Sequence, residues 1–182
     1  MSKNVVYLHR FYEGVQMGTD VPYFYTKNMS IKEKAKKLLE EALEERPDIF
    51  LIDFTISENN DIKLVIDSDT GATVDDIVFI SRKIEHNLDR EVEDFSLTVS
   101  SVDITQPFAL LRQFKKNIDR KIKVKTETGE KEGKLVAVEA NEILIEYKVR
   151  EPKPVGKGKV TVIKQDKIAF DDIKEAKVVL KF

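Results

Sequence analysis

The first part of the chain carries apolar residues with a helical period. They lie three or four positions apart up to about Glu45: Ile31, Ala35, Leu38, Leu39 and Ala42. This spacing predicts an amphipathic helix with one apolar and one charged face. Ser30, followed three residues later by Glu33, has the pattern of a capping box. We therefore expect the helix to begin there and to end before Pro47.

Two strands are predicted after this helix. Residues 49–56 form a nearly continuous apolar run, which is typical of a well-buried strand, and residues 58–61 have the composition of a turn. Ile62, Leu64 and Ile66 then alternate along the chain, so one face of the second strand should be buried. The pattern predicts a β-hairpin.

A second helix and a third strand complete the first half. Thr73 with Asp76 three residues later makes a second capping box, and an apolar stripe with helical spacing runs from it to Leu88. Alternating apolar residues at 95–99 indicate a further strand. The order helix, strand, strand, helix, strand predicts a small sheet covered on one face by two helices.

The chain changes character after Pro107. Short alternating runs, separated by charged or glycine-bearing turns, predict five strands, near residues 122–124, 135–138, 143–147, 160–162 and 178–180. Five such strands in so short a segment point to a small β-barrel, with one turn of helix near residues 168–173. We expect the proline- and glycine-rich segment 151–159 to be an exposed loop.

The net charge of -2 conceals two halves of opposite sign. Residues 1–103 carry 12 Lys and Arg against 21 Asp and Glu, a net charge of -9, whereas residues 104–182 carry 19 against 12, a net charge of +7. Such a split predicts two domains with different partners, one over residues 29–103 and the barrel over 104–182. Residues 1–28 show no sustained period, and we expect them to be a poorly ordered extension or to lie upstream of the natural start.

Composition narrows the class of protein further. The hydrophobic share of 41% and the charged share of 35% are those of a soluble globular protein. No apolar run reaches the roughly 18 residues that a membrane span needs. The chain contains no cysteine, so it forms no disulfide or zinc–thiolate site, in keeping with a cytoplasmic location.

No motif in the sequence supports catalysis or a cofactor. Residues 69–71 (Asp-Thr-Gly) match the short signature of aspartic proteases, but that chemistry needs apolar residues directly before the aspartate. His86 has no second histidine or cysteine nearby to complete a metal site. A small hydrolase built on Asp67, Asp69 and Asp75 stays as an alternative, which mutation of these acids would test.

The segment after Pro107 is better suited to binding. Between residues 112 and 125 it holds seven cations against the single acid Asp119, with Phe108 and Phe114 interleaved. Such cations can grip phosphates, and aromatic rings can stack on bases. Alternatively, both phenylalanines belong to the core and the lysines are merely solvated.

These residues resemble a known family. The resemblance rests on the order and spacing of several short motifs: Leu64-Val65-Ile66-Asp67, Gly71, Val74-Asp75-Asp76, Ser81-Arg82, Leu88-Asp89, Val99-Ser100-Ser101 and Pro107-Phe108. From about residue 30 to its end, the chain is similar to the bacterial ribosome maturation factor RimP family. The resemblance implies an α+β fold, in which an N-terminal two-helix, three-strand α/β domain precedes a C-terminal Sm-like (SH3-like) small β-barrel.

The resemblance also implies a function, late assembly of the small ribosomal subunit without catalysis. The implied partners are the immature small subunit, its rRNA and small-subunit ribosomal protein twelve, for a cytoplasmic monomer with no cofactor and no membrane contact. The residues that we expect to meet the ribosome are Ser100, Ser101, Arg112, Lys115, Lys116, Arg120, Lys121, Lys157 and Lys159. The alternative is an Sm-like adaptor that binds RNA or protein and has no role in ribosome assembly.

The junction between the halves departs from the pattern of that family. The family usually has Ser-Ser-Pro-Gly, then an aliphatic residue, an acid, Arg and Pro, whereas here Val102 and Asp103 replace Pro-Gly, and Thr105 and Gln106 replace the acid and Arg. Loss of the glycine restricts the backbone, and loss of the arginine removes a fork for phosphate or carboxylate. We therefore expect a retained fold with altered contacts at the junction.

Overall fold

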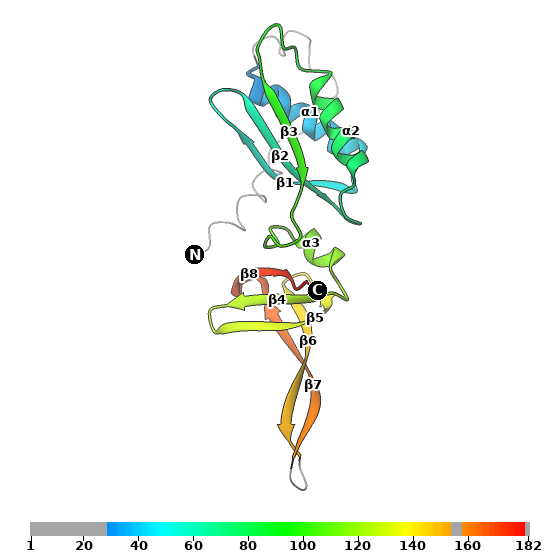
Figure 1. Ribbon diagram of the computed structural model, residues 1–182, viewed down its shortest axis with the longest axis vertical. Helices are drawn as coiled ribbons and strands as arrows, with labels where there is room; N and C mark the ends of the chain where they lie inside the picture. Colours follow the sequence, from blue (N-terminus) through cyan, green and yellow to red (C-terminus); the bar gives the residue numbers. More distant parts are fainter. Residues whose placement is uncertain (1–28, 154–157, 181–182) are drawn as a thin grey trace. The chain divides into compact units, whose positions relative to one another are not determined.

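The computed structural model describes residues 29–153 and 158–180. These residues form an α+β fold with three α-helices and two sheets (Figure 1). They divide into two compact units, the first ending at Val102 and the second beginning at Asp103. The expected extension over residues 1–28 lies outside the described residues. No helix in the described part of the chain is long and apolar enough to cross a membrane.

The first unit contains a three-stranded sheet in the order β1-β2-β3. β1 (Ile49–Ile56) and β2 (Asp61–Ser68) form the predicted antiparallel hairpin, whereas β3 (Ser96–Ser101) pairs with β2 in parallel. Parallel neighbours need a long crossover connection, which α2 (Val74–Glu85) supplies. Asn60 takes the left-handed conformation at the hairpin turn, with φ 60°, which asparagine tolerates better than most residues.

Both helices of this unit begin at the predicted capping boxes. At the start of α1 (Ile31–Glu45), the backbone N–H of Ser30 donates to Glu33 at 2.8 Å, and the N–H of Glu33 donates to the Ser30 hydroxyl at 3.3 Å. Thr73 and Asp76 make the same two bonds at the start of α2, at 2.8 and 3.3 Å. Each box satisfies two backbone donors that a helix end would otherwise leave without a partner.

The two helices cover one face of the sheet, and the hydrophobic core lies between the helices and the sheet (Figure 1). α2 ends at Glu85, one turn before the end of the predicted stripe, although Leu88 stays buried just beyond it. Alternation along β2 directs one set of side chains toward the helices. The buried residues that close this core are Ile31, Ala35, Leu39, Ala42, Ile49, Ile62, Leu64, Ile66, Ile80, Ile84, Leu88 and Phe95.

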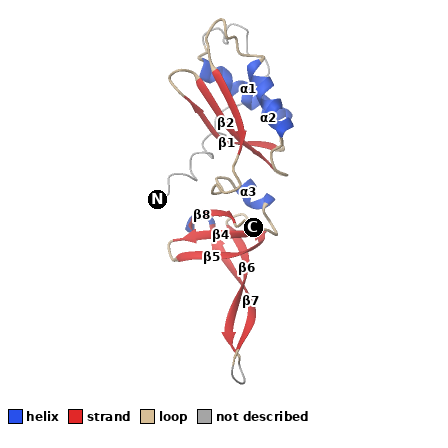
Figure 2. Cartoon of the chain, in the orientation of Figure 1, coloured by secondary structure: helices blue, strands red, loops and turns tan. Residues whose placement is uncertain are grey.

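The second unit is built mainly from strands (Figure 2). Its sheet is antiparallel throughout, in the order β7-β6-β5-β4-β8. The strands are β4 (Lys121–Thr126), β5 (Gly129–Val138), β6 (Glu142–Pro152), β7 (Lys159–Ala169) and β8 (Ile173–Val178). The first four contain the runs from which they were predicted, and β6 and β7 also continue into the segment expected to be a loop.

The last strand and the closure of the sheet differ from the prediction. β8 ends where the predicted strand 178–180 begins, because its buried residue is the small Ala176, which gives a weak apolar signal. The predicted helical turn is a 3₁₀ turn over Phe170–Asp172. β8 pairs with β4, and no ladder joins it to β7 in the described part of the chain. The predicted small barrel is therefore not closed by hydrogen bonds there.

The helix α3 (Leu111–Lys116) was not predicted. Its six residues make fewer than two turns, which is too short for an apolar period to be recognised. Gln113 closes its first turn, because its Oε1 accepts from the backbone N–H groups of Ala109 and Leu110 at 2.7 and 3.1 Å. The helix carries one residue into the core of the second unit, whose buried members are Phe114, Ile122, Val124, Leu135, Ile143, Ile145, Ile168 and Ala176.

Candidate nucleic-acid interface

The predicted basic segment folds into α3 and the turn that follows it. Arg112 lies three and four positions before Lys115 and Lys116, so these cations share one side of the helix. Arg120 then ends the turn, and Lys121 begins β4. The fold therefore brings five of the predicted site residues into one short stretch of the second unit.

Buried Asn117 holds this turn in place. Its Nδ2 donates to the carbonyl of Gln113 at 2.7 Å, and its Oδ1 accepts from Arg120 at 3.3 Å. Asp119 follows in the left-handed conformation, with φ 71°, which reverses the chain before β4. A buried amide is held rigidly when both its nitrogen and its oxygen are hydrogen-bonded, and the bond to Arg120 therefore fixes the position of that side chain.

Acids on the neighbouring strand neutralise lysines of β4. Lys121 forms an ion pair with Glu132 at 2.7 Å, and this contact lowers the pKa of Glu132. Lys123 hydrogen-bonds Glu130, which raises the pKa of Lys123 and lowers that of Glu130. Lys121, a predicted phosphate contact, thus has a carboxylate partner within the sheet. The sequence holds the signal for this, since Glu130 and Glu132 lie opposite Lys125 and Lys123 in the hairpin register.

The remaining predicted cations lie elsewhere in the second unit. Lys159 begins β7 and lies opposite Pro152, at the far end of the β6–β7 hairpin. β5 pairs with β6 only as far as Glu146, which lies opposite Gln165 of β7. Lys159 is six residues from Gln165 along β7, a distance of about 20 Å. Lys157 lies outside the described residues. The predicted set is therefore divided between α3 and the hairpin end.

The two predicted serines end β3 in the first unit. Both are exposed, and the hydroxyl of Ser100 donates to the carbonyl of Leu64 at 3.5 Å, a long contact. Ser101 pairs with Ile66 at the end of the parallel ladder. These contacts are those of residues that finish a strand.

The two phenylalanines of the basic segment belong to the core. Phe114 is buried and meets Phe108 edge to face at 4.9 Å between ring centroids, and Phe170 at 5.3 Å. Burial leaves Phe114 closed to a stacking base, and Phe108 is partly buried against the same core. Of the two alternatives, core packing is the one that the structure supports.

The acids of the hydrolase alternative do not form a metal site in the described residues, where no group of three or more His, Cys, Asp or Glu side chains could hold a metal ion. Asp67 is buried, and its Oδ1 accepts from the backbone N–H of Ser68 at 2.8 Å. Asp75 is an exposed residue of the first turn of α2, where a carboxylate complements the helix dipole.

A charge network between the helices was not predicted. Arg46, which caps the end of α1, donates to Asp48 at 3.0 Å and to Asp76 at 2.7 Å, and these bonds raise its pKa. Burial disfavours the charged form of Asp76, but hydrogen bonds from Thr73 and Arg46 outweigh it and lower the pKa of Asp76. Arg46 and Asp76 are 30 residues apart, and no local sequence pattern links residues at that distance.

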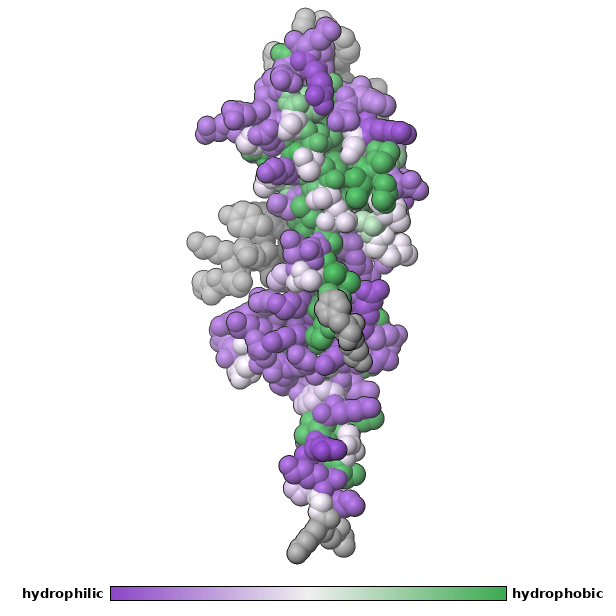
Figure 3. Space-filling view, in the orientation of Figure 1, coloured by the Kyte–Doolittle hydropathy of each residue, from purple (hydrophilic) through white to green (hydrophobic). Residues whose placement is uncertain are grey.

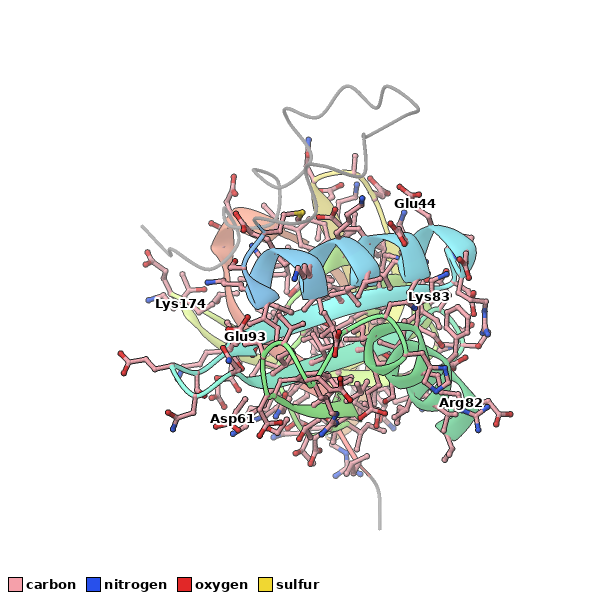
Figure 4. The ribbon with its side chains drawn as sticks, turned by 90° about the horizontal axis from the view of Figure 1, so that it is seen from above. Glu44, Asp61, Arg82, Lys83, Glu93 and Lys174 are labelled. Atoms are coloured by element: carbon pink, nitrogen blue, oxygen red, sulfur yellow. The ribbon has the colours of Figure 1, made fainter. Side chains whose placement is uncertain are left out.

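The outer face of α2 carries an apolar patch, formed by two residues that the sequence pattern had placed in the apolar stripe of this helix. The side chain of Val74 is 75% exposed and that of Val78 is 36% exposed, and green residues gather over this part of the first unit in Figure 3. Beside them lies an open hollow of about 430 Å³, lined by Asp75, Val78, Phe79, Arg82, Lys83, His86 and Asn87. Figure 4 shows Arg82 pointing outward, whereas Lys83 forms an ion pair with Glu45 of α1. The predicted stripe was therefore wrong at Val74 and Val78, which face outward, whereas Ile84 and Leu88 are buried as predicted.

Fold and charge together define a class, an α+β protein with an acidic first unit and a basic second unit built mainly from strands. A family model described as the RimP N-terminal domain matches residues 38–103. The chain belongs to the RimP family of ribosome maturation factors, as its motifs predicted, and its similarity to members of that family extends over most of its length.

Three relatives carry this assignment, each named ribosome maturation factor RimP. The chain is 51% identical over 152 residues to the protein of Christiangramia forsetii, covering 84% of this chain and 99% of the relative. It is 47% identical over 154 residues to that of Flavobacterium psychrophilum, covering 85% and 100%. It is 37% identical over 129 residues to that of Porphyromonas gingivalis, covering 70% and 84%.

Proposed function

We propose that this protein is a ribosome maturation factor that binds the immature small ribosomal subunit and assists its assembly without catalysis. The observation that carries the proposal is the 51% identity to a ribosome maturation factor RimP, over nearly the whole of that protein.

In this proposal each of the two units binds a different partner. The second unit, with its net charge of +7 from residue 104 onward, contacts rRNA phosphate, and α3 with the turn after it supplies Arg112, Lys115, Lys116 and Arg120. The acidic first unit faces a basic ribosomal protein, for which small-subunit ribosomal protein twelve is our candidate. Complementary charge speeds the encounter and suppresses wrong partners.

We also propose the finer architecture implied by the family. Residues 29–103 and 104–182 are two domains, and the second is an Sm-like barrel. The compact units, with their boundary at Val102 and Asp103, support the first point. The strand order, in which the last strand lies beside the first of five, supports the second. The protein then works as a cytoplasmic monomer.

A sucrose-gradient profile of cells lacking the gene tests the function directly. We expect a deficit of mature small subunits, and in normal cells we expect the protein to migrate with the free small subunit. Normal subunits, with a protein that stays at the top of the gradient, would overturn the proposal in favour of an adaptor acting away from the ribosome.

A charge reversal tests the role of α3. We expect Lys115→Glu with Lys116→Glu to weaken association with small subunits at least tenfold at physiological salt, since each lost phosphate contact reduces affinity strongly. Lys32→Glu with Lys37→Glu makes the same change of charge on α1 in the acidic unit, and should have a smaller effect. Equal losses in the two variants would show that only net charge matters.

A further inference from the structure

The β6–β7 hairpin continues well beyond the rest of its sheet. β5 pairs with β6 only as far as Glu146, whereas β6 and β7 remain paired from there to Pro152 and Lys159. We call the part from Tyr147 to Pro152 and from Lys159 to Lys164 the ribbon. A two-stranded ribbon twists more strongly than a wider sheet, so its side chains follow a curved path.

The two faces of the ribbon differ in composition. Residues directly opposite each other in an antiparallel pair have their side chains on the same face. The register places one set together, Lys148 with Ile163, Arg150 with Thr161, and Pro152 with Lys159. The opposite face holds Tyr147 with Lys164, Val149 with Val162, and Glu151 with Val160. The first set, which we call the basic face, contains three cations and no acid.

The cations of the basic face lack carboxylate partners, in contrast to eight lysines of the second unit. Lys121, Lys123, Lys131, Lys134, Lys164, Lys167, Lys174 and Lys177 each form an ion pair with an Asp or Glu. Lys148, Arg150 and Lys159 form no ion pair within residues 29–153 and 158–180, and all three are exposed. A charge with a protein partner is partly neutralised, whereas these three are available to an external anion.

The spacing of these cations suits an extended anion. Lys148 and Arg150 are two residues apart on β6, about 7 Å, and Lys159 lies a similar distance further along on β7. Beside them on β7, Thr161 lies opposite Arg150, and Ile163, which is 57% exposed, lies opposite Lys148. The face is a single row of positive charge with one hydroxyl and one apolar contact, which fits a phosphate backbone better than one isolated anion.

We propose that the basic face of the ribbon binds the phosphate backbone of double-helical RNA. The contact is independent of base sequence, because the face holds no aromatic side chain for stacking, and the Tyr147 hydroxyl donates to Asp166 at 2.8 Å on the other side. An A-form helix offers phosphates and 2′-hydroxyls across its shallow groove, and proteins read it largely by shape. The inference deepens the proposed function, on which it rests for the source of the RNA.

The test measures binding of the full chain to a labelled RNA hairpin with a perfect stem, over a range of salt concentrations. The ribbon variant is Lys148→Gln, Arg150→Gln and Lys159→Gln. The matched control is Lys131→Gln, Lys134→Gln and Lys167→Gln, which removes the same charge from exposed, ion-paired positions of the same unit. We expect the ribbon variant to bind on the order of 10- to 100-fold more weakly near 0.1 M salt, with a salt dependence reduced by about two to three ions.

Three outcomes would overturn the inference. The first is that the ribbon variant binds the RNA as tightly as the wild type, and the second is that the ribbon variant and the control lose equal affinity. The third is that polyglutamate displaces the RNA as effectively as unlabelled duplex does, which would indicate an acidic protein partner. If the triple variant does not fold, the single change Arg150→Gln should still reduce the salt dependence by about one ion. Failure here, with the wild-type chain still migrating with small subunits, would leave the proposed function standing.

Discussion

Asp76 performs two roles through a single carboxylate. One oxygen accepts from the backbone and hydroxyl of Thr73 to cap α2, and the other accepts from Arg46 at the end of α1. The side chain is almost fully buried, so loss of its charge would leave Arg46 without one of its two carboxylates. This residue therefore couples the start of one helix to the end of the other.

We expect Asp76→Asn to destabilise the protein by about 1 kcal/mol at about pH 7, the usual cost of a weakened cap. Hydrogen bonding lowers the pKa of Asp76 in the folded state, so its stabilisation is complete above the unfolded pKa of about 3.9 and is lost as the pH falls through the folded pKa. The difference between wild type and variant in urea unfolding should therefore shrink toward about pH 2. A difference that is constant with pH would contradict this account.

Gly133 allows β5 and β6 to approach closely. A Cβ built at this position would lie 2.7 Å from the backbone oxygen of Glu146, closer than real contacts allow. We expect Gly133→Ala to lower the free energy of unfolding by about 1–3 kcal/mol, because backbone atoms must move to accept the methyl group. Thermal unfolding followed by circular dichroism measures this, and an unchanged midpoint would show that the strands separate without cost.

At the level of the element, α3 depends on one anchor. Phe114 contacts Phe108 and Phe170 within the core, whereas Ile118, just after the helix, is 38% exposed. We expect Phe114→Ala to cost about 3–5 kcal/mol in urea unfolding, and the matched control Ile118→Ala to cost less than about 1 kcal/mol. Similar losses of unfolding free energy in the two variants would show that Phe114 is not the residue that anchors α3.

The elements themselves were predictable where a local pattern defines them. Both capping boxes, the hairpin and four of the second unit's strands follow from spacings within about ten residues. α3 was missed because its start is closed by Gln113 rather than by a recognised capping residue. Which cations of the basic segment are paired with carboxylates was not predictable either. Lys121 meets Glu132 only because of the register in which β4 and β5 pair across their turn. Strand closure is decided by such long-range pairings as well.

At the scale of the whole molecule, the charge split coincides with the two compact units. We expect residues 29–103 and 104–182, expressed separately, each to unfold cooperatively, because each unit has a core of its own. At about pH 7 the first should bind an anion exchanger and the second a cation exchanger. A piece that fails to fold alone would show that the boundary divides a single cooperative structure.

The contrast between paired and unpaired cations has an evolutionary consequence. A lysine held by a carboxylate in the sheet, such as Lys121 with Glu132, is constrained by its own chain, so a change at one position favours a compensating change at the other. Lys148 and Arg150 form no ion pair in the part of the chain that the structure describes, so no carboxylate there constrains them. If RNA constrains them instead, related sequences should exchange Lys and Arg freely at these two positions, but should rarely place a neutral or acidic residue there.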